Sequence, residues 1–370
     1  MTPHRVLMTT DAVGGVWTYA LDLAHGLADA GVTVSLAVLG PEPTPDQRRA
    51  AGAVPGLDLI ETGLPLDWMA AEPAEIEAPA AAMRALASRV RADLVHLNSP
   101  ALAAGPAFGP PVLGACHSCL ATWWTAVKGG EMPAEFRWRT QALRRGLAAC
   151  DALLAPTHAF ADAVARTYDL PRPLVVHNGR RSPARQPRAA REPIVFTSGR
   201  LWDEGKNAGV LDAAAALTDA QVVAAGPLQG PGGERFEPRR LKPLGRLSSE
   251  EVSARLSDAA IFASSALYEP FGLGVLEAGQ AGCALVLSDI ASFRELWDGA
   301  ALFADPRDPA AFAGAFNRLL ADPAEIRLRG QLAQARAARF TAEAMSEGVL
   351  QIYQSLAKAT AAPRRREATA

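Results

Sequence analysis

Two glutamates mark the stretch in which this sequence concentrates its chemistry. Glu269 and Glu277 are separated by seven residues within SSALYEPFGLGVLEAGQAG, residues 264–282. We expect a strand to end near Ser264, a loop to hold Glu269, and a helix to begin near Gly272 and carry Glu277 on an early turn. Free N–H groups at a helix start bind anions, and glycine lets a ligand approach the backbone closely. The amides concerned are those of Phe271, Gly272 and Leu273.

The two carboxylates would frame this anion site. Glu277 cannot usefully bind a phosphate, and it would instead accept hydrogen bonds from the hydroxyls of a sugar or ribose. A glutamate near a helix start can also serve only to stabilise the helix dipole. The spacing of the two residues by itself leaves both interpretations open.

A second charged loop, GRLWDEGKNAGV at residues 199–210, has the composition of a phosphate loop but not its spacing. A P-loop places four residues between its first glycine and the Gly-Lys pair, and Ser or Thr follows the lysine. Here five residues separate the two glycines, and Asn207 follows the lysine. Arg200 and Lys206 both stand beside glycines after a predicted strand, so they could hold a phosphate from the side. The alternative is a solvated charged loop.

Polar side chains also follow two predicted strands of the N-terminal half. His117 stands at the carboxyl end of one strand, and Asn98 and Ser99 end another. Carboxyl ends of parallel strands share one edge of a sheet, so these residues are expected on the same rim. His117 could equally be a structural histidine.

The cysteines flanking His117 form a Cys-x-x-Cys motif. Cys116 and Cys119 could be a redox pair or half of a zinc site. The remaining cysteines, Cys150 and Cys283, are isolated in the sequence. We therefore predict no metal site there.

Short apolar runs alternate with helical patterns along the chain, which is typical of parallel sheets covered by helices on both faces. A chain of 370 residues exceeds what one core usually supports. We predict an α/β fold of two doubly wound Rossmann-like domains facing an interdomain cleft, with ligands bound outside the carboxyl ends of the strands. The expected strands lie at residues 5–10, 32–40, 57–63, 94–99, 111–118, 152–157, 174–179, 194–199, 221–226, 241–247, 260–265, 284–289 and 301–306.

The composition indicates where the domains meet. Residues 180–193 are rich in Arg and Pro without an apolar period, which predicts a linker. The predicted domains are residues 1–179 and 194–345. Residues 346–370 are expected to form a C-terminal helix, able to pack back on the first domain, and a tail that is disordered over residues 362–370.

Bulk properties exclude several classes of function and location. The net charge of -2 gives no reason to expect nucleic-acid binding. The sequence has no signal peptide, no apolar stretch long enough to span a membrane, and too few cysteines for a disulfide framework, so we predict a cytoplasmic location. Residues 123–147 mix aromatics with arginines and could rest on the inner face of a membrane. A solvated helix face bordering the core is the alternative that we favour.

Taken together, the motifs resemble retaining glycosyltransferases with the GT-B fold, in family 4 (glycosyl transferases group 1). The two glutamates match the family's E-x7-E motif, and GR...GKN resembles its diphosphate clamp. VHNG at residues 176–179 resembles the crossover into the second domain. LGRLS at residues 244–248 resembles the nucleobase-side segment, and DAVGGVWTYALDLAHGL the N-terminal Gly-Gly loop and helix.

The resemblance implies a role for each candidate residue. Glu277 would hold the nucleotide ribose and Glu269 the donor-sugar hydroxyls, while Arg200 and Lys206 would neutralise the diphosphate. The catalytic set would be Arg200, Lys206, Glu269 and His117. Further donor contacts would come from Gly15, Leu247, Phe271, Gly272 and Leu273. Acceptor contacts would come from Gly14, Trp17, Asn98 and Ser99, although Trp17 stands where many relatives carry a polar or charged residue.

The implied activity is transfer of a sugar, with retention, from a UDP- or GDP-sugar to a glycan or lipid-linked acceptor. No cofactor is expected, and no Asp-x-Asp metal signature is present. Three alternatives remain: a nucleotide-sugar epimerase, a non-catalytic nucleotide-sugar-binding protein, and an NAD(P)-dependent oxidoreductase. The oxidoreductase is disfavoured because neither Gly-rich loop fits the dinucleotide fingerprint.

Overall fold

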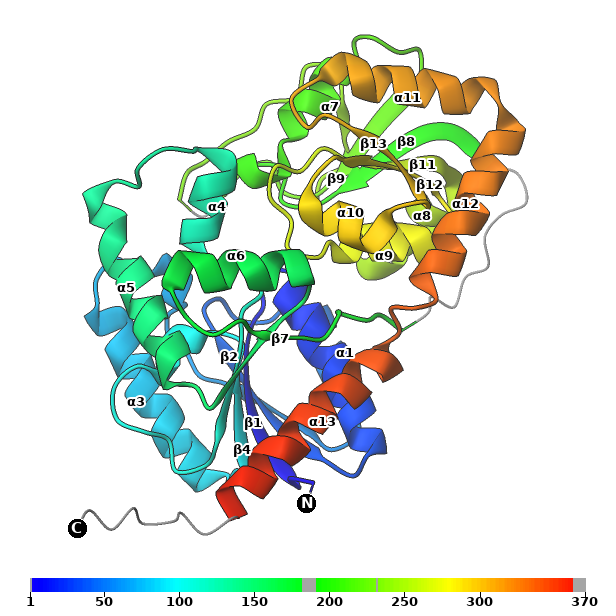
Figure 1. Ribbon diagram of the computed structural model, residues 1–370. Helices are drawn as coiled ribbons and strands as arrows, with labels where there is room; N and C mark the ends of the chain where they lie inside the picture. The colour runs from blue at the N-terminus through cyan, green and yellow to red at the C-terminus, as the bar shows by residue number, and fades with distance from the viewer. Residues whose placement is uncertain (1, 182–190, 231, 362–370) are drawn as a thin grey trace, which may run out of the picture.

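The computed structural model describes residues 2–181, 191–230 and 232–361. Most of the predicted linker, residues 182–190, and the predicted disordered tail at residues 362–370 lie outside the described residues. Figure 1 shows two lobes, each built on one sheet, with helix α13 lying across the lobe that contains β1 and β4. No described helix has the combination of length and hydropathy needed to cross a membrane.

The first lobe contains a seven-stranded sheet in the order β3-β2-β1-β4-β5-β6-β7. Every neighbouring pair in it is parallel. Its strands are β1 (Arg5–Asp11), β2 (Thr33–Leu39), β3 (Leu57–Glu61), β4 (Leu94–Leu97), β5 (Val112–Ala115), β6 (Ala152–Ala155) and β7 (Leu174–Val175). Its helices are α1 (Gly15–Asp29), α2 (Pro45–Gly52), α3 (Ala74–Arg89), α4 (Leu120–Val127), α5 (Ala134–Ala149) and α6 (His158–Tyr168), with short 3₁₀ turns η1 (Asp67–Met69) and η2 (Pro100–Ala103).

The second lobe contains a six-stranded sheet in the order β10-β9-β8-β11-β12-β13, also parallel throughout. Its strands are β8 (Glu192–Ser198), β9 (Gln221–Ala225), β10 (Lys242–Pro243), β11 (Ala259–Ser264), β12 (Ala284–Ser288) and β13 (Ala301–Ala304). Its helices are η3 (Glu204–Lys206), α7 (Ala208–Ala214), α8 (Ser249–Asp258), α9 (Leu273–Gln280), α10 (Ala291–Trp297), α11 (Pro309–Ala321) and α12 (Pro323–Ala337), followed by α13 (Ala342–Ala361). The predicted fold class, two doubly wound α/β domains, is confirmed.

Each sheet is buried on both faces, which is why its strands read as continuous apolar runs. In the first lobe one core lies under α1 and α13 and another under α3. The second sheet likewise separates a core under α9 and α10 from a core under α7 and α11. Two predicted strands shorten to two residues. One is β10, at an edge of its sheet, where Pro243 has no N–H to donate to a ladder. The other is β7, at an edge of the first sheet.

The strand order creates one topological switch point in each sheet. In the first it lies between β1 and β4, and in the second between β8 and β11. Open parallel sheets bind ligands at such points, outside the carboxyl ends of the strands. The loops that leave these four strands are therefore the ones that matter for function.

Helix α13 joins the end of the chain to the first lobe. Its residues Met345, Val349 and Tyr353 lie in the same core as Leu23 of α1. The Tyr353 hydroxyl is 2.7 Å from Nδ1 of His96, a fully buried residue of β4. Burial lowers the pKa of His96 to about 3, so this imidazole is neutral.

The close contact between Gly26 of α1 and Ser346 of α13 predicts a stability effect. A Cβ on Gly26 would lie 2.2 Å from Ser346 Oγ and 2.4 Å from Ser346 Cβ. Gly26→Ala should therefore lower the free energy of unfolding by about 1–3 kcal/mol through overpacking. Gly314→Ala in α11 is the control: its Cβ would meet no atom within 4 Å, so it should stabilise by about 0.5–1 kcal/mol. Urea denaturation checks both, and equal effects of the two substitutions would contradict the close packing.

Candidate functional site

The loops at the two switch points face each other across the lobes. A Cβ on Gly14, which follows β1, would lie 3.5 Å from Nη1 of Arg200, which follows β8. A Cβ on Gly15 would lie 3.3 Å from Cδ1 of Leu273, the first residue of α9. The absence of side chains at Gly14 and Gly15 thus lets their backbone lie close to the second lobe. Larger residues at these positions would push the two apart. The structure brings together these candidate residues from both halves of the chain.

A partly buried carboxylate shapes the glycine loop. Asp11, the last residue of β1, accepts hydrogen bonds from the backbone N–H groups of Val13 at 2.8 Å and Gly14 at 3.2 Å. Burial raises the pKa of Asp11, and these two hydrogen bonds and the charge of Arg200 oppose that rise. Asp11 therefore fixes the backbone of the loop at Val13 and Gly14.

Arg200 is positioned by a turn that contains an acidic partner. Its Nη2 lies 2.9 Å from Oδ2 of Asp203, whose other oxygen accepts from the Gly205 N–H at 2.9 Å. Nε of Arg200 is buried and has no hydrogen-bond partner within the described residues. An unsatisfied buried donor on a cation marks a position where an anion would be stabilised.

Lys206 forms an ion pair with Glu269, so the charged loop after β8 meets the first glutamate of the E-x7-E motif. The next residue, Asn207, has a left-handed backbone (φ 54°). Its side-chain amide donates to the carbonyls of Ser265 at 2.9 Å and Pro306 at 2.6 Å. Asn207 thus fastens the lysine loop to the ends of β11 and β13. Sequence reasoning used this residue only as an argument against a P-loop.

Helix α9 starts as the sequence predicts. Gly272 occupies the N-cap with φ 92°, a left-handed conformation that favours glycine. Among the described residues no side chain caps this helix. Its amino end is therefore available to an anion next to Glu269. The Glu269 carbonyl accepts a hydrogen bond from the Ser292 hydroxyl at 2.5 Å, which ties the loop to α10.

Glu277 takes part in a partly buried cluster of three charges that sequence reasoning did not foresee. Arg180 Nε lies 3.0 Å from Oε1 of Glu277 in α9, and the same guanidinium pairs with Asp22 in α1. The backbone N–H of Arg180 also donates to the Phe340 carbonyl at 3.2 Å. The only sequence signal was that Arg180 directly follows the VHNG crossover, at the first position of the predicted linker.

His117 belongs to a hydrogen-bond chain that spans three strands. Its Nε2 lies 2.7 Å from Oδ1 of Asn98, whose Nδ2 donates to the Thr9 carbonyl at 2.7 Å. Because the Thr9 carbonyl can only accept, the Asn98 oxygen faces His117, and the His117 proton resides on Nε2. Burial lowers the pKa of His117 to about 4, so the ring is neutral and Nδ1 keeps its lone pair.

The other residues predicted to contact donor or acceptor lie in different surroundings. Trp17 is 5% exposed and packs against Val38 and Ala51, so its indole belongs to the core rather than to an open surface. Ser99 is the N-cap of η2, at the end of β4. Leu247 packs against the core under α9.

The cysteine motif lies at a contact between the lobes. Cys116 and Cys119 are buried free thiols. The Cys119 N–H donates to the Tyr268 hydroxyl at 3.1 Å, and Thr122 Oγ1 lies 2.9 Å from the same hydroxyl. These bonds fix the start of α4 beside the loop that carries Glu269.

The aromatic and basic segment at residues 123–147 forms α4 and α5. Trp123 Nε1 donates to Asp203 Oδ1 of the second lobe at 3.3 Å. Trp124 and Phe136 pack with ring centroids 5.8 Å apart, and Trp138 packs against the core under α3. Membrane contact by this segment stays a prediction.

The three-charge cluster makes a pH-dependent prediction about stability. Burial raises the pKa of both Asp22 and Glu277, and Arg180 opposes this. Arg180→Gln should raise both pKa values further and lower the free energy of unfolding by about 3–5 kcal/mol at neutral pH. A carboxyl group whose pKa is raised in the folded state destabilises folding when ionised and is relieved on protonation. The deficit should therefore shrink as the pH falls from 7.5 to 5.

Urea denaturation at both pH values measures the effect of Arg180→Gln. The matched control is Arg145→Gln, since Arg145 is an exposed arginine of α5. A deficit of the same size at both pH values would mean that Arg180 acts through packing rather than charge.

Comparisons with known proteins identify the family of the chain. The model described as Glycosyltransferase Family 4 matches residues 13–180, and the model described as Glycosyl transferases group 1 matches residues 180–339. The chain is 28% identical over 297 residues to glycogen synthase of Mycobacterium tuberculosis strain H37Rv, covering 71% of this chain and 69% of the relative.

Solved structures share the fold. Sucrose-phosphate synthase from Thermosynechococcus elongatus superimposes with a TM-score of 0.78 at 20% identity, covering 96% of this chain and all (100%) of the other. Anabaena HepE in complex with UDP-glucose gives a TM-score of 0.70 at 17% identity, covering 95% and 99%. Both family models describe glycosyltransferases, so an oxidoreductase is no longer a candidate. The chain belongs to glycosyltransferase family 4, has the GT-B fold, and is a glycosyltransferase.

Proposed function

We propose that the protein transfers a sugar, with retention and without a metal ion in the reaction, from a UDP- or GDP-sugar to a glycan or lipid-linked acceptor. The observation that carries this proposal is the convergence of Arg200, Lys206 and the amino end of α9 opposite the Gly14–Gly15 loop. Two positively charged side chains and a free helix start can stabilise a diphosphate leaving group in place of a metal ion. UDP is favoured for the first tests because HepE, a protein of the same fold, was solved with UDP-glucose.

The donor diphosphate would replace a contact that the protein makes with itself. Lys206 pairs with Glu269, and a phosphate would take over the ammonium group. Glu269 would then be free to accept hydrogen bonds from donor-sugar hydroxyls. The unpartnered Nε of Arg200 would bind the same diphosphate from the side of the glycine loop. Glu277, held by Arg180, would accept from the ribose hydroxyls.

Transfer with retention places the departing diphosphate and the attacking hydroxyl on the same face of the sugar. A donor phosphate oxygen would accept the acceptor proton as the bond to the diphosphate breaks. The protein would then contribute mainly position and charge stabilisation. Closure of the lobes around the donor would exclude water and limit hydrolysis.

His117 would contribute as a neutral hydrogen-bond acceptor. Its Nε2 proton is committed to Asn98, so Nδ1 is the nitrogen that could accept from a sugar hydroxyl. Asn98 would act through His117, by holding the tautomer, rather than by touching the acceptor. Gly14 and Ser99 remain acceptor-side proposals, since both follow strands at the first switch point.

The two cations give the most direct test of the donor site. Arg200→Ala and Lys206→Ala should each lower kcat/KM about 10- to 150-fold, because a charge-assisted hydrogen bond contributes roughly 1.5–3 kcal/mol. Lys242→Ala is the control, since Lys242 is exposed at the edge strand of the same lobe. The donor is first identified by thermal shift and slow donor hydrolysis with UDP-, GDP- and ADP-sugars. Wild-type turnover in both variants would overturn the assignment.

Acceptor tests follow from the names of the relatives. Glycogen synthase points to glucans, and the neighbour WaaG is described as involved in lipopolysaccharide biosynthesis, which points to glycolipids. Release of an altered free sugar without any acceptor would favour the epimerase instead.

His117→Ala should lower kcat/KM about tenfold, the effect of losing one hydrogen bond of roughly 1.5 kcal/mol. With the pKa of His117 at about 4, its charge does not change between pH 5.5 and 8. The wild-type rate should therefore show no titration of His117 in that range, and the ratio of variant to wild type should stay constant. A ratio that changes with pH would mean that His117 transfers a proton.

A further inference from the structure

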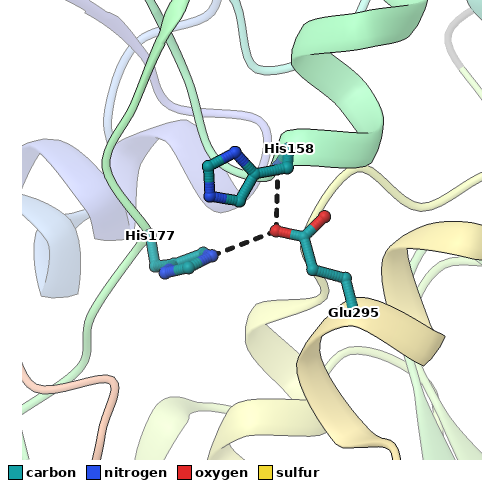
Figure 2. Close-up of side chains that lie close together, drawn as sticks. All are labelled: His158, His177 and Glu295. Carbon is teal, nitrogen blue, oxygen red and sulfur yellow. Dashed lines mark hydrogen bonds and ion pairs between the residues drawn. The ribbon is translucent and has the colours of Figure 1, made fainter.

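A cluster of two imidazoles and one carboxylate joins the two lobes and includes none of the residues proposed to bind the donor (Figure 2). His158 is the first residue of α6, and His177 follows β7, both in the first lobe. Glu295 comes from α10 in the second lobe. One potential ligand atom from each residue lies within 4.8 Å of the other two. Among the described residues this is the only group of three or more such side chains that could hold a metal ion.

The distance between His177 and Glu295 is close to the distance between two ligands of one zinc ion. His177 Nε2 lies 3.1 Å from Glu295 Oε1. Two ligands bound to zinc at about 2.0–2.1 Å with a tetrahedral angle lie about 3.3 Å apart. An ion could therefore take the place of the proton between His177 and Glu295 with little movement of either side chain.

Glu295 is held as metal-binding carboxylates usually are. Its Oε1 accepts a hydrogen bond from the backbone N–H of His158 at 2.8 Å, and its Oε2 accepts one from the backbone N–H of Ala159 at 2.7 Å. Burial raises the pKa of Glu295, but hydrogen bonds from His177 and these two amides outweigh it and keep the pKa below its usual value. Hydrogen bonds to a ligating carboxylate fix its orientation. The carboxylate is thus ionised and preoriented, and its exposed neighbour His158 leaves a route from solvent.

We propose that His158, His177 and Glu295 form a zinc site that links the two lobes, with water in the fourth position. Two histidines and one glutamate are an established zinc-ligand set, and a three-ligand site keeps one position open. Each histidine would bind through an unprotonated ring nitrogen, so the proton between His177 Nε2 and Glu295 would move to His177 Nδ1 as the ion takes its place.

Arg172 opposes the ion and makes the proposal testable. Its Nη2 lies 3.0 Å from His158 Nδ1, and its Nε lies 2.5 Å from Asp162 Oδ1. If zinc binds His158 Nδ1, it displaces Arg172 directly. If it binds Nε2, the ring proton moves to Nδ1, which can then no longer accept from Arg172. In either case Arg172 must leave His158, and it can do so while keeping Asp162 as its partner.

The site would connect to the donor loop through short contacts. Thr157, next to His158, donates its hydroxyl to the Pro270 carbonyl at 2.9 Å. Ser292, one turn before Glu295, donates to the Glu269 carbonyl at 2.5 Å. Zinc would therefore cross-link the lobes beside the loop that carries Glu269.

The test is zinc titration of the full-length, chelator-treated protein, followed by calorimetry and by the visible spectrum of the cobalt(II) form. We expect one zinc per chain and a tetrahedral cobalt spectrum. His177→Phe, which keeps the ring contact with Phe340, and Glu295→Gln, which keeps an oxygen for the amides, should each weaken zinc binding at least 100-fold. Arg172→Gln should tighten it.

His4→Gln is the control for adventitious binding, because His4 is an exposed histidine far from the cluster in sequence. Thermal unfolding without zinc establishes that each variant is folded. Zinc affinity unchanged by both His177→Phe and Glu295→Gln, or lowered equally by His4→Gln, would overturn the site. These readouts do not depend on the donor or acceptor, so they are separate from any test of the transferase.

Discussion

One partly buried arginine joins the two lobes at the point where the chain crosses between them. Arg180 lies where the chain crosses from one sheet to the other and pairs with both Asp22 of α1 and Glu277 of α9. Asp22 is only 8% exposed, so its charge could not be left unpaired without a penalty of several kcal/mol. The crossover is therefore fixed to both lobes. The glutamate proposed to bind ribose is oriented by the same contact.

Around this charge cluster, contacts between the lobes support the candidate site from several sides. Tyr268 bonds the start of α4, Thr157 bonds the Pro270 carbonyl, and Glu295 caps the start of α6. Each joins the first lobe either to the loop around Glu269 or to the helix behind it. Such supporting contacts hold binding groups in place before a ligand arrives, which is how a site of fixed charges stabilises a developing charge.

Much of the fold and some of the site could be predicted from local patterns. Buried parallel strands are continuous apolar runs, so their positions were evident, and the E-x7-E spacing placed Glu277 on the first helical turns after Gly272. Trp17 shows the limit of that approach, because its indole turned out to be packed in the core. A position on a helix start does not tell which face of the helix a side chain occupies. The pairing of Lys206 with Glu269 was likewise invisible, although both residues had been singled out.

The sequence by itself determined the family, the alternation of strands and helices, and which loops carry charge, because these depend on residues close together in the chain. The tertiary structure alone decided which groups far apart in the sequence form hydrogen bonds and ion pairs. Asp22 and Arg180 are 158 positions apart, His158 and Glu295 are 137, and His96 and Tyr353 are 257. No local pattern encodes such pairs. They exist because two sheets and a returning helix bring buried polar groups together, and a buried polar group must find a partner wherever the fold provides one.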